Sequence, residues 1–354
     1  MVTTDDRITA DEAYGLACQG IAMLWRSDFQ NARQLLIAMA SRVDRKQRRR
    51  PASMAPEAPS VDLFNRVRQA RAQRSRTLGM LLIELDADYG IALRRAPDVR
   101  QACREAYGAS ADASVVSLRE LLGVIGAHQW RLRGIDVPAA GGPIHPHYGV
   151  FTPTRSEYLD LVDKAPLPAA GGPIATAFDI GTGTGVLAAV LARRGIRQVI
   201  GTDTDPRAIA CARENVDRLG LSDRIDIQQT DLFPEGRAQL VVCNPPWVPA
   251  RPGSALERGI YDQDSAMLRG FLGGLAAHLS PDGEGWLILS DLAEHLGLRS
   301  RDSLLALIDS AGLEVAGRID TRPRHPRTTD RDDPLHAARR AEVTSLWRLR
   351  TRRA

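Results

Sequence analysis

The sequence is poor in cysteine and contains no long apolar run. Its 354 residues include only 4 cysteines, which are spread along the chain without the close spacing of a metal-binding motif. No stretch approaches the ~18 uncharged apolar residues that a membrane span needs. The N-terminal residues lack the apolar core of a signal peptide. We therefore expect a cytoplasmic protein with reduced cysteines, no metal site and no membrane partner.

Aromatic residues are also scarce, at 5% of the chain. An aromatic side chain inside a polar motif is therefore informative. Apolar residues make up 44% and charged residues 25%, which is typical of a globular protein and excludes a largely disordered or collagen-like chain. At ~100–200 residues per domain, the length predicts two domains and allows three.

Lysine is almost absent, because only 2 of the 47 basic residues are lysine and the rest are arginine. The net charge of +4 is unevenly distributed: residues 42–76 carry +8 and residues 318–353 carry +6. Segregated positive charge is typical of proteins that bind polyanions such as nucleic acid. A coding bias explains an arginine excess equally well, so the charge alone leaves nucleic-acid binding open.

Residues 1–130 predict a smaller helical domain. Thr9 and Glu12 form a capping box before a helical apolar pattern, and a second helical stretch covers residues 28–45. Basic residues and a segment rich in Pro, Ala and Ser predict an exposed basic linker near 42–60. Leucines then recur at helical spacing; they are Leu78, Leu81, Leu82 and Leu85. The pattern favours a packed helical bundle that serves substrate recognition or partner binding.

Residues 131–150 predict a β-hairpin connector, with strands at 133–137 and 144–150 around Gly141-Gly142-Pro143. Across residues 151–354, strands and helices alternate, which predicts an α/β domain with a doubly wound, mainly parallel sheet. The expected strands are 174–180, 198–203, 225–229, 240–243, 286–289, 313–319 and 343–349. We expect the last two strands to be antiparallel and joined without a helix. The intervening residues, 320–342, predict a solvated loop or a substrate-facing lid.

A glycine-rich segment follows the first strand of this domain and opens a helix. It reads Asp179-Ile-Gly181-Thr182-Gly183-Thr-Gly185. Its glycines allow a tight turn and a close approach of the backbone to a ligand. Asp203 ends the next strand, where an acidic side chain can accept hydrogen bonds from ribose hydroxyls. Asp231 follows the third strand, where it can accept from an adenine amino group. These features at successive strand ends predict nucleoside binding.

The fourth strand ends in the motif Asn244-Pro245-Pro246-Trp247. Two prolines stiffen the turn, so the side-chain oxygen of Asn244 and the carbonyl oxygen of Pro245 can be held toward one point. Two such acceptors match the two N–H bonds of a planar NH2 group, and Trp247 offers a flat face to the conjugated group that carries it. Accepting these bonds builds negative charge on a nitrogen that is otherwise a poor nucleophile. The motif predicts reaction of an amide or exocyclic amine nitrogen with an electrophile.

At these residues the sequence resembles the class I S-adenosylmethionine-dependent methyltransferases, specifically the amino-methyltransferases with an Asn-Pro-Pro-aromatic motif. The resemblance covers about residues 148–350 and implies a Rossmann-like sheet, S-adenosylmethionine as cofactor, and catalytic roles for Asn244, Pro245 and Trp247. A Phe-Thr-Pro segment is similar to the one that contacts the methionine end of the cofactor in adenine-specific and glutamine-specific members. The implied cofactor-binding residues are Phe151, Thr152, Pro153, Asp179, Gly181, Thr182, Gly183, Gly185, Asp203, Asp231, Leu232 and Asn244.

The order of helical domain, hairpin and catalytic domain is similar to the release-factor glutamine methyltransferases. It implies a protein glutamine side chain as substrate and partners in the translation machinery. Trp247 departs from the usual tyrosine of that family, and the N-terminal region is longer. A base of RNA or DNA is an alternative substrate that the basic segments favour, and a small-molecule amine is another. A non-catalytic nucleoside-binding scaffold is the alternative outside enzymes.

Overall fold

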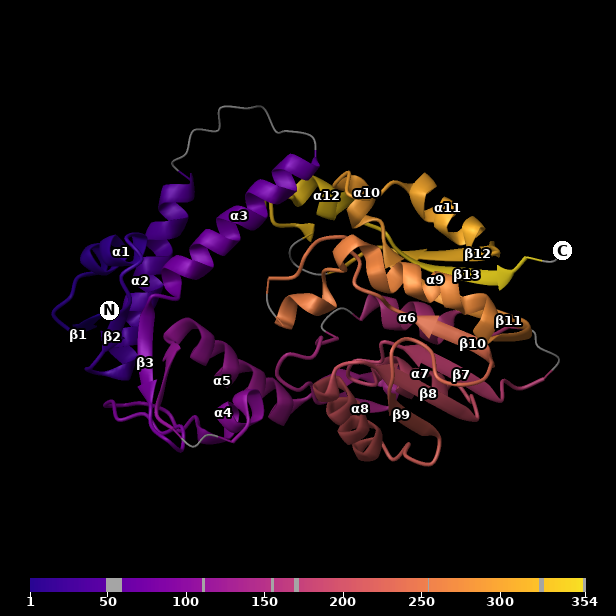
Figure 1. The fold of residues 1–354 in the computed structure, drawn as a ribbon, viewed down its shortest axis with the longest axis horizontal. Coiled ribbons are helices and arrows are strands. Elements are labelled where there is room, and N and C mark those ends of the chain that lie inside the picture. The colour runs from indigo at the N-terminus through magenta and orange to yellow at the C-terminus, as the bar shows by residue number, and fades with distance from the viewer. Residues whose placement is uncertain are drawn as a thin grey trace. The chain divides into compact units, whose positions relative to one another are not determined.

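The computed structural model of the protein describes residues 1–48, 59–109, 112–153, 156–168, 172–253, 255–324 and 328–352. The chain divides into two compact units (Figure 1). Apart from a short segment around residue 60, unit 1 covers the chain up to Trp130 and unit 2 begins at Arg131. Among the described residues, no helix combines the length and the apolar composition needed to cross a bilayer.

Unit 1 is a mixed α/β unit. Its sheet has the order β1-β2-β3-β4, in which β1, β2 and β3 are parallel and β4 runs antiparallel to β3. The strands are β1 (Val2–Thr4), β2 (Met23–Trp25), β3 (Leu81–Leu85) and β4 (Ser114–Ser117). The helices are α1 (Ala10–Cys18), α2 (Phe29–Arg48), α3 (Val61–Leu78), α4 (Arg100–Tyr107) and α5 (Leu118–Arg133). The predicted basic linker falls largely outside the described residues.

The prediction of a purely helical bundle for residues 1–130 is therefore wrong. In β3, Leu81 and Ile83 are fully buried whereas Glu84 is exposed, so burial follows the two-residue period of a strand. The leucines here also match a helical spacing, and the shorter strands have too few residues to show any period. The local signals were more reliable: Thr9 and Glu12 form the predicted capping box at the start of α1.

The hairpin consists of β5 (Ile135–Val137) and β6 (Gly142–Ile144), joined by the short 3-10 turn η1 (Pro138–Ala140). Its second strand shares only Ile144 with the predicted 144–150 and includes Gly142 and Pro143, which the prediction placed in the turn. Pro146 has no N–H to donate, and the neighbouring backbone N–H groups of His145 and His147 donate to Asn215 and Cys211 on another element. Val137 and Ile144 are buried in the core of unit 2, so the hairpin belongs to that unit and is not a separate connector.

Unit 2 contains a sheet with the order β12-β13-β11-β10-β7-β8-β9. Only β13 runs antiparallel to its neighbours. The strands are β7 (Thr176–Ile180), β8 (Gln198–Asp203), β9 (Ile225–Gln229), β10 (Ala238–Cys243), β11 (Leu279–Ser290), β12 (Leu313–Thr321) and β13 (Thr344–Thr351). The helices are α6 (Glu157–Lys164), α7 (Val186–Arg193), α8 (Pro206–Arg218), α9 (Ala266–His278), α10 (Leu292–His295), α11 (Arg301–Ser310) and α12 (His336–Ala341). The predicted α/β fold class is confirmed.

The connection between the last two strands differs from the prediction. β12 and β13 are antiparallel as expected, but α12 lies between them in the chain, and β13 pairs with both β12 and β11. At 6 residues, α12 is too short to show an apolar period in the sequence. Residues 320–342 are therefore partly helical.

Helices cover both faces of this sheet (Figure 1). Along β10, Leu240 and Val242 join the apolar cluster that contains residues of α6, α7 and α8. The alternate residues Val241 and Cys243 join the cluster that contains residues of α9 and α11. A strand whose residues are buried on both faces is typical of a parallel sheet between two helical layers, which leaves the strand ends as the accessible edges.

Candidate active site

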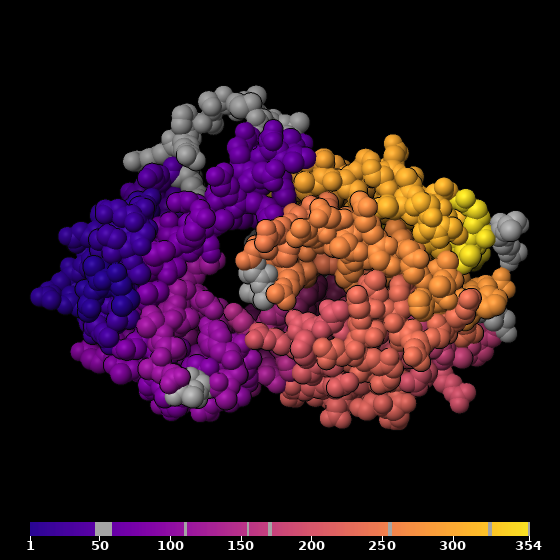
Figure 2. All heavy atoms as spheres, in the orientation of Figure 1, coloured from indigo at the N-terminus to yellow at the C-terminus, as the bar shows by residue number. Residues whose placement is uncertain are grey.

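The predicted site residues follow neighbouring strands of unit 2. Cys243 at the end of β10 lies opposite Ile180 of β7, and Ile180 lies opposite Thr202 of β8. The next residues along these strands are Asn244, Gly181 and Asp203, so all three lie at the carboxyl edge of the sheet. On the face shown in Figure 2, unit 2 is hollowed between its pink and orange residues. Carboxyl edges are where open α/β sheets bind ligands.

The three glycines after β7 have positive φ angles of 72° (Gly181), 56° (Gly183) and 79° (Gly185). A Cβ at Gly185 would lie 3.3 Å from atoms of Ala212, so this glycine lets the loop pack closely on α8. A Cβ at Gly183 would meet nothing nearer than 3.9 Å, so the backbone here borders open space. The loop therefore combines a packed end with an accessible backbone.

Asp179, the penultimate residue of β7, is fully buried. The Thr182 hydroxyl donates to its Oδ2 atom over 2.6 Å, and the backbone N–H of Ala188 donates to the same atom over 3.0 Å. The Oδ1 atom is buried and has no hydrogen-bond partner among the residues that the structure describes. Burial raises the pKa of Asp179 to about 6. This carboxylate thus holds the glycine loop with one of its two oxygens.

Asp203 joins the end of β8 to the glycine loop. One carboxylate oxygen accepts from the backbone N–H of Gly183 over 3.1 Å, and the other accepts from the N–H of Asp205 over 3.0 Å. Burial raises the pKa of Asp203. Asp231 is exposed in the loop after β9, and the carbonyl of the next residue, Leu232, accepts from the Thr202 hydroxyl. That bond ties the loop to β8. Asp203, predicted to bind the ribose, and Asp231, predicted to bind the adenine, therefore lie at the ends of neighbouring strands.

The Asn-Pro-Pro-Trp turn contains a bond that the sequence analysis missed. The indole N–H of Trp247 donates to Oδ1 of Asn244 over 2.8 Å. Trp247 is half-buried and packs against the apolar clusters of both sheet faces, and its carbonyl accepts from Arg299 over 3.4 Å. The ring is therefore a fixed support for the Asn244 amide. A donor three residues after the asparagine is the signal that could have indicated this bond.

The segment Phe151–Pro153 lies apart from the hydrogen-bonded loop. Phe151 is 38% exposed, whereas Pro153 is buried. A Cβ at Gly259 would lie 2.8 Å from Phe151, so this segment packs against the chain that follows the Asn-Pro-Pro-Trp turn. Thr152 donates only to the carbonyl of Val150, over 3.5 Å. Within the described residues, no hydrogen bond joins the segment to the glycine loop.

Comparison with known proteins agrees with this geometry. The family described as "Ribosomal protein L11 methyltransferase (PrmA)" matches residues 158–245. The release factor glutamine methyltransferase of Cereibacter sphaeroides is 34% identical over 168 residues, which cover 42% of this chain and 58% of the relative. The ribosomal protein L11 methyltransferase of Pelotomaculum thermopropionicum is 44% identical over 71 residues, which cover 20% and 23%. The chain thus spans less than two thirds of the length of either relative.

Numbered in chain order, the strands of unit 2 lie in the order 3-2-1-4-5-7-6, and only the seventh is antiparallel. Within unit 2, residues 158–245 are similar in sequence to methyltransferases. A solved structure that resembles the chain is the ribosomal protein L11 methylase of Lactobacillus delbrueckii subsp. bulgaricus, with a TM-score of 0.39, 20% sequence identity, and coverage of 59% of this chain and 86% of that one.

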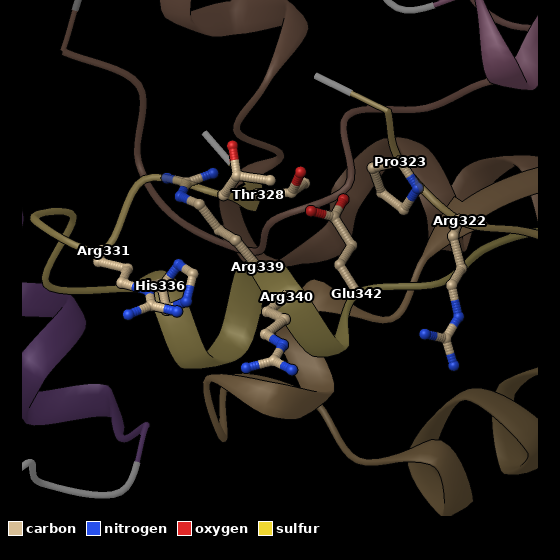
Figure 3. Close-up of a pocket in the computed structure, with 9 residues that line it drawn as sticks. Arg322, Pro323, Thr328, Arg331, His336, Arg339, Arg340 and Glu342 are labelled. Atoms are coloured by element: carbon tan, nitrogen blue, oxygen red, sulfur yellow. The ribbon is translucent and has the colours of Figure 1, made fainter. Parts of the chain in front are cut away.

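Unit 2 also contains a cavity of about 330 Å³ near α12 (Figure 3). Its lining residues are Arg322, Pro323, Thr328, Thr329, Arg331, His336, Arg339, Arg340 and Glu342. Thr321 at the end of β12 and Ser290 at the end of β11 both lie opposite Thr344 of β13. The cavity therefore lies at the carboxyl edge of the sheet, on the β12 side of Asn244. The positive charge of residues 318–353 is visible in the sequence, whereas the position of this cavity depends on the fold.

Proposed function

We propose that the protein transfers a methyl group from S-adenosylmethionine to a planar NH2 nitrogen. One observation carries the proposal: the glycine loop, the strand-end acids and Asn244 follow adjacent strands at one edge of the sheet. Loops from adjacent strand ends can hold a nucleoside and an acceptor nitrogen side by side. The similarity to named methyltransferases supports the same reaction.

The residues at the edge fit this cofactor. Its ammonium group and ribose hydroxyls are hydrogen-bond donors, and the site offers carboxylates. The buried Oδ1 of Asp179 lacks a partner among the described residues and would be satisfied by a donor at the glycine loop. Asp203 would accept from the ribose, and Asp231 and Leu232 would border the adenine. When bound, the cofactor supplies an electrophilic methyl carbon.

Asn244 and Pro245 bind the substrate nitrogen that accepts the methyl group. The Asn244 oxygen has two lone pairs, and the indole N–H of Trp247 occupies one of them. The other lone pair and the Pro245 carbonyl accept the two N–H bonds of the substrate nitrogen. Because the indole can donate only to an oxygen, it selects the amide orientation that presents an acceptor rather than an NH2 group. The two bonds place negative charge on the nitrogen, and methyl transfer to it would break the bond between sulfur and the methyl carbon and release one N–H proton to solvent.

We favour a protein glutamine side chain as the substrate. The relatives named for release factor glutamine and ribosomal protein L11 methylation support a protein of the translation machinery, and therefore a cytoplasmic location. Phe151, Thr152 and Pro153 would border the methionine end of the cofactor in this proposal. The region up to Trp130 would recognise the substrate or a partner.

Nucleic-acid methylation is the second candidate, because positive charge is concentrated in two segments. The structure accounts for part of that charge within the protein. Arg348 and Arg350 both pair with the buried Glu284, and Arg339 pairs with Asp333. These arginines are engaged in the fold, which favours the protein substrate.

A labelling experiment tests the proposal and separates its alternatives. The protein is incubated with cell extract and methyl-labelled S-adenosylmethionine, and the extract is fractionated into protein, RNA, DNA and small molecules. We expect label in protein, at an amide nitrogen, and at least ~10²-fold less with Asn244→Ala, because that variant lacks the transition-state acceptor. Label in a nucleic acid or in a small molecule would identify the alternative substrate. No transfer to any fraction would favour a non-catalytic nucleoside-binding scaffold.

A further inference from the structure

We propose that the cavity near α12 binds an acidic segment of the protein substrate. The inference rests on the proposed function and adds a recognition site to it. We call Arg322, Arg331 and Arg340 the rim arginines, because all three line this cavity. Their guanidinium groups would pair with carboxylates that neighbour the methylated residue in the substrate.

The position of the cavity favours a role in substrate binding. Along the carboxyl edge, Asp203 and Asp231 follow the strands on one side of β7, where the cofactor residues lie. β11, β13 and β12 lie on the other side of β10, and the cavity borders their ends. A substrate that reaches Asn244 without displacing the cofactor can extend along this second half of the edge. Asp203 and Asp231 therefore lie on the half of the edge proposed for the cofactor, and the rim arginines lie on the half proposed for the substrate.

The rim arginines differ in their charge partners from several other arginines of residues 318–353. Other arginines of the same segment have acidic partners: Arg318 pairs with Asp320, Arg352 with Asp309, and Arg348 and Arg350 with Glu284. By contrast, the rim arginines form no ion pair within the ranges that the structure describes, and all three residues are exposed. Three arginines without an ion pair among the described residues thus border one cavity.

The wall behind the rim is built from fixed side chains. Arg339 is 10% exposed at its side chain and pairs with Asp333 over 2.8 Å. The buried Glu342 accepts from the Ser290 hydroxyl over 2.7 Å, which ties the residue after α12 to the end of β11. Figure 3 shows Arg340 and Arg322 extending in the same direction, away from Thr328, with Arg331 beside His336. The residues on either side of Arg340 along this wall, Arg339 and Glu342, are therefore anchored to Asp333 and Ser290.

The lining favours carboxylates on a polypeptide over a single-stranded nucleic acid. Guanidinium groups bind carboxylates and phosphates through paired hydrogen bonds. Proteins that hold single strands add aromatic rings on which the bases stack. Among the described residues that line this cavity, none is Phe, Tyr or Trp, and the one aromatic ring belongs to His336. A volume of about 330 Å³ accommodates a few acidic side chains.

Binding of a defined probe tests the inference without methyl transfer. A fluorescein-labelled octa-aspartate peptide is titrated with the full chain and followed by fluorescence anisotropy at low salt. We expect saturable binding that weakens at least ~10-fold in the variant Arg322→Gln/Arg331→Gln/Arg340→Gln, since this variant loses three charged contacts at once. Circular dichroism melting verifies that the variant is folded. Unchanged peptide binding by a folded variant would overturn the proposal.

A charge-matched variant provides the control. Arg133, Arg197 and Arg237 are exposed residues of unit 2 outside the lining of the cavity, and changing all three to Gln removes the same charge. We expect this control to bind the peptide within ~2-fold of the wild type. An equal loss in both variants would show nonspecific attraction and overturn the site. A labelled octauridylate is titrated in the same way. If it binds the wild type more tightly than the peptide does, and if this binding requires the rim arginines, the ligand of the cavity is a nucleic acid and not an acidic protein segment.

Failure of the cavity proposal can be distinguished from failure of the proposed function. If the rim variant loses peptide binding but no extract fraction accepts a methyl group from the wild type, the cavity stands and the enzymatic proposal fails. If label enters a protein and the rim variant raises KM for that protein without lowering kcat, both proposals stand. Equal transfer kinetics in wild type and rim variant, together with unchanged peptide binding, would reject the cavity alone.

Discussion

Replacing Trp247 by Phe tests whether the indole orients the Asn244 amide. The variant keeps an aromatic ring in the half-buried position but removes the donor that bonds to Asn244 over 2.8 Å. Without that donor, the amide can rotate so that its NH2 group faces the substrate nitrogen. A ring that serves only as a flat face for the substrate would tolerate this change.

The structure sets the expected magnitude. A neutral hydrogen bond contributes about 0.5–1.5 kcal/mol, so we expect kcat to fall about 3–10-fold in Trp247→Phe. Asn244→Ala removes the acceptor itself and is expected to lower kcat by at least ~10²-fold. Since Trp247 acts through Asn244, the double variant should be no slower than Asn244→Ala alone.

The assay is a double-mutant cycle on the labelled extract fraction, with cofactor affinity and thermal unfolding measured for each variant. We expect unchanged cofactor affinity and strong non-additivity of the kcat losses. Losses that simply multiply would show that Trp247 contributes independently of Asn244, and this would refute the orienting role. An unchanged kcat in Trp247→Phe would refute it as well.

Three further predictions concern the cofactor site and the fold. Asp203→Ala should weaken S-adenosylmethionine binding at least ~10-fold in titration calorimetry, because it removes a charged acceptor; an unchanged Kd would exclude Asp203 from the site. Burial raises the pKa of Asp179 to about 6, so protonation below that pH removes the charge that would attract the ammonium group of the cofactor. Cofactor affinity should therefore fall from about pH 7.5 to about pH 5.5, whereas Asp179→Asn should bind weakly without this step; a pH-independent wild type would contradict the assignment. Against the opposing effect of burial, hydrogen bonds from Arg218 and His147 lower the pKa of Glu214 from 4.5 to about 2. The charged Glu214 therefore stabilises the folded state above pH 4.5, and this stabilisation is lost as the pH falls toward 2. Glu214→Gln should lower the free energy of unfolding by about 1–3 kcal/mol at pH 7, and the difference between variant and wild type should become smaller as the pH falls. Equal denaturant midpoints at pH 7 would rule this out.

Local sequence signals predicted most of unit 2. β8 and β9 have the predicted bounds, since short apolar strands between turn residues are visible in the sequence alone. The glycines after β7 likewise indicated a turn, and they have positive φ angles there. In unit 1 the same reasoning failed, because its sheet joins β2 and β3, which α2 and α3 separate along the chain. Pairing between distant short strands leaves no local period to detect.

The sequence by itself determined which chemical groups follow each strand of unit 2, because the order of residues along the chain is covalent. The tertiary structure alone decided which of those groups meet. The Trp247 bond to Asn244 depends on how the turn folds, and the pairing of Arg348 with Glu284 joins residues 64 positions apart. Hydrogen bonds and ion pairs act over about 3–4 Å, so a side chain is engaged or left for a ligand according to its neighbours in space.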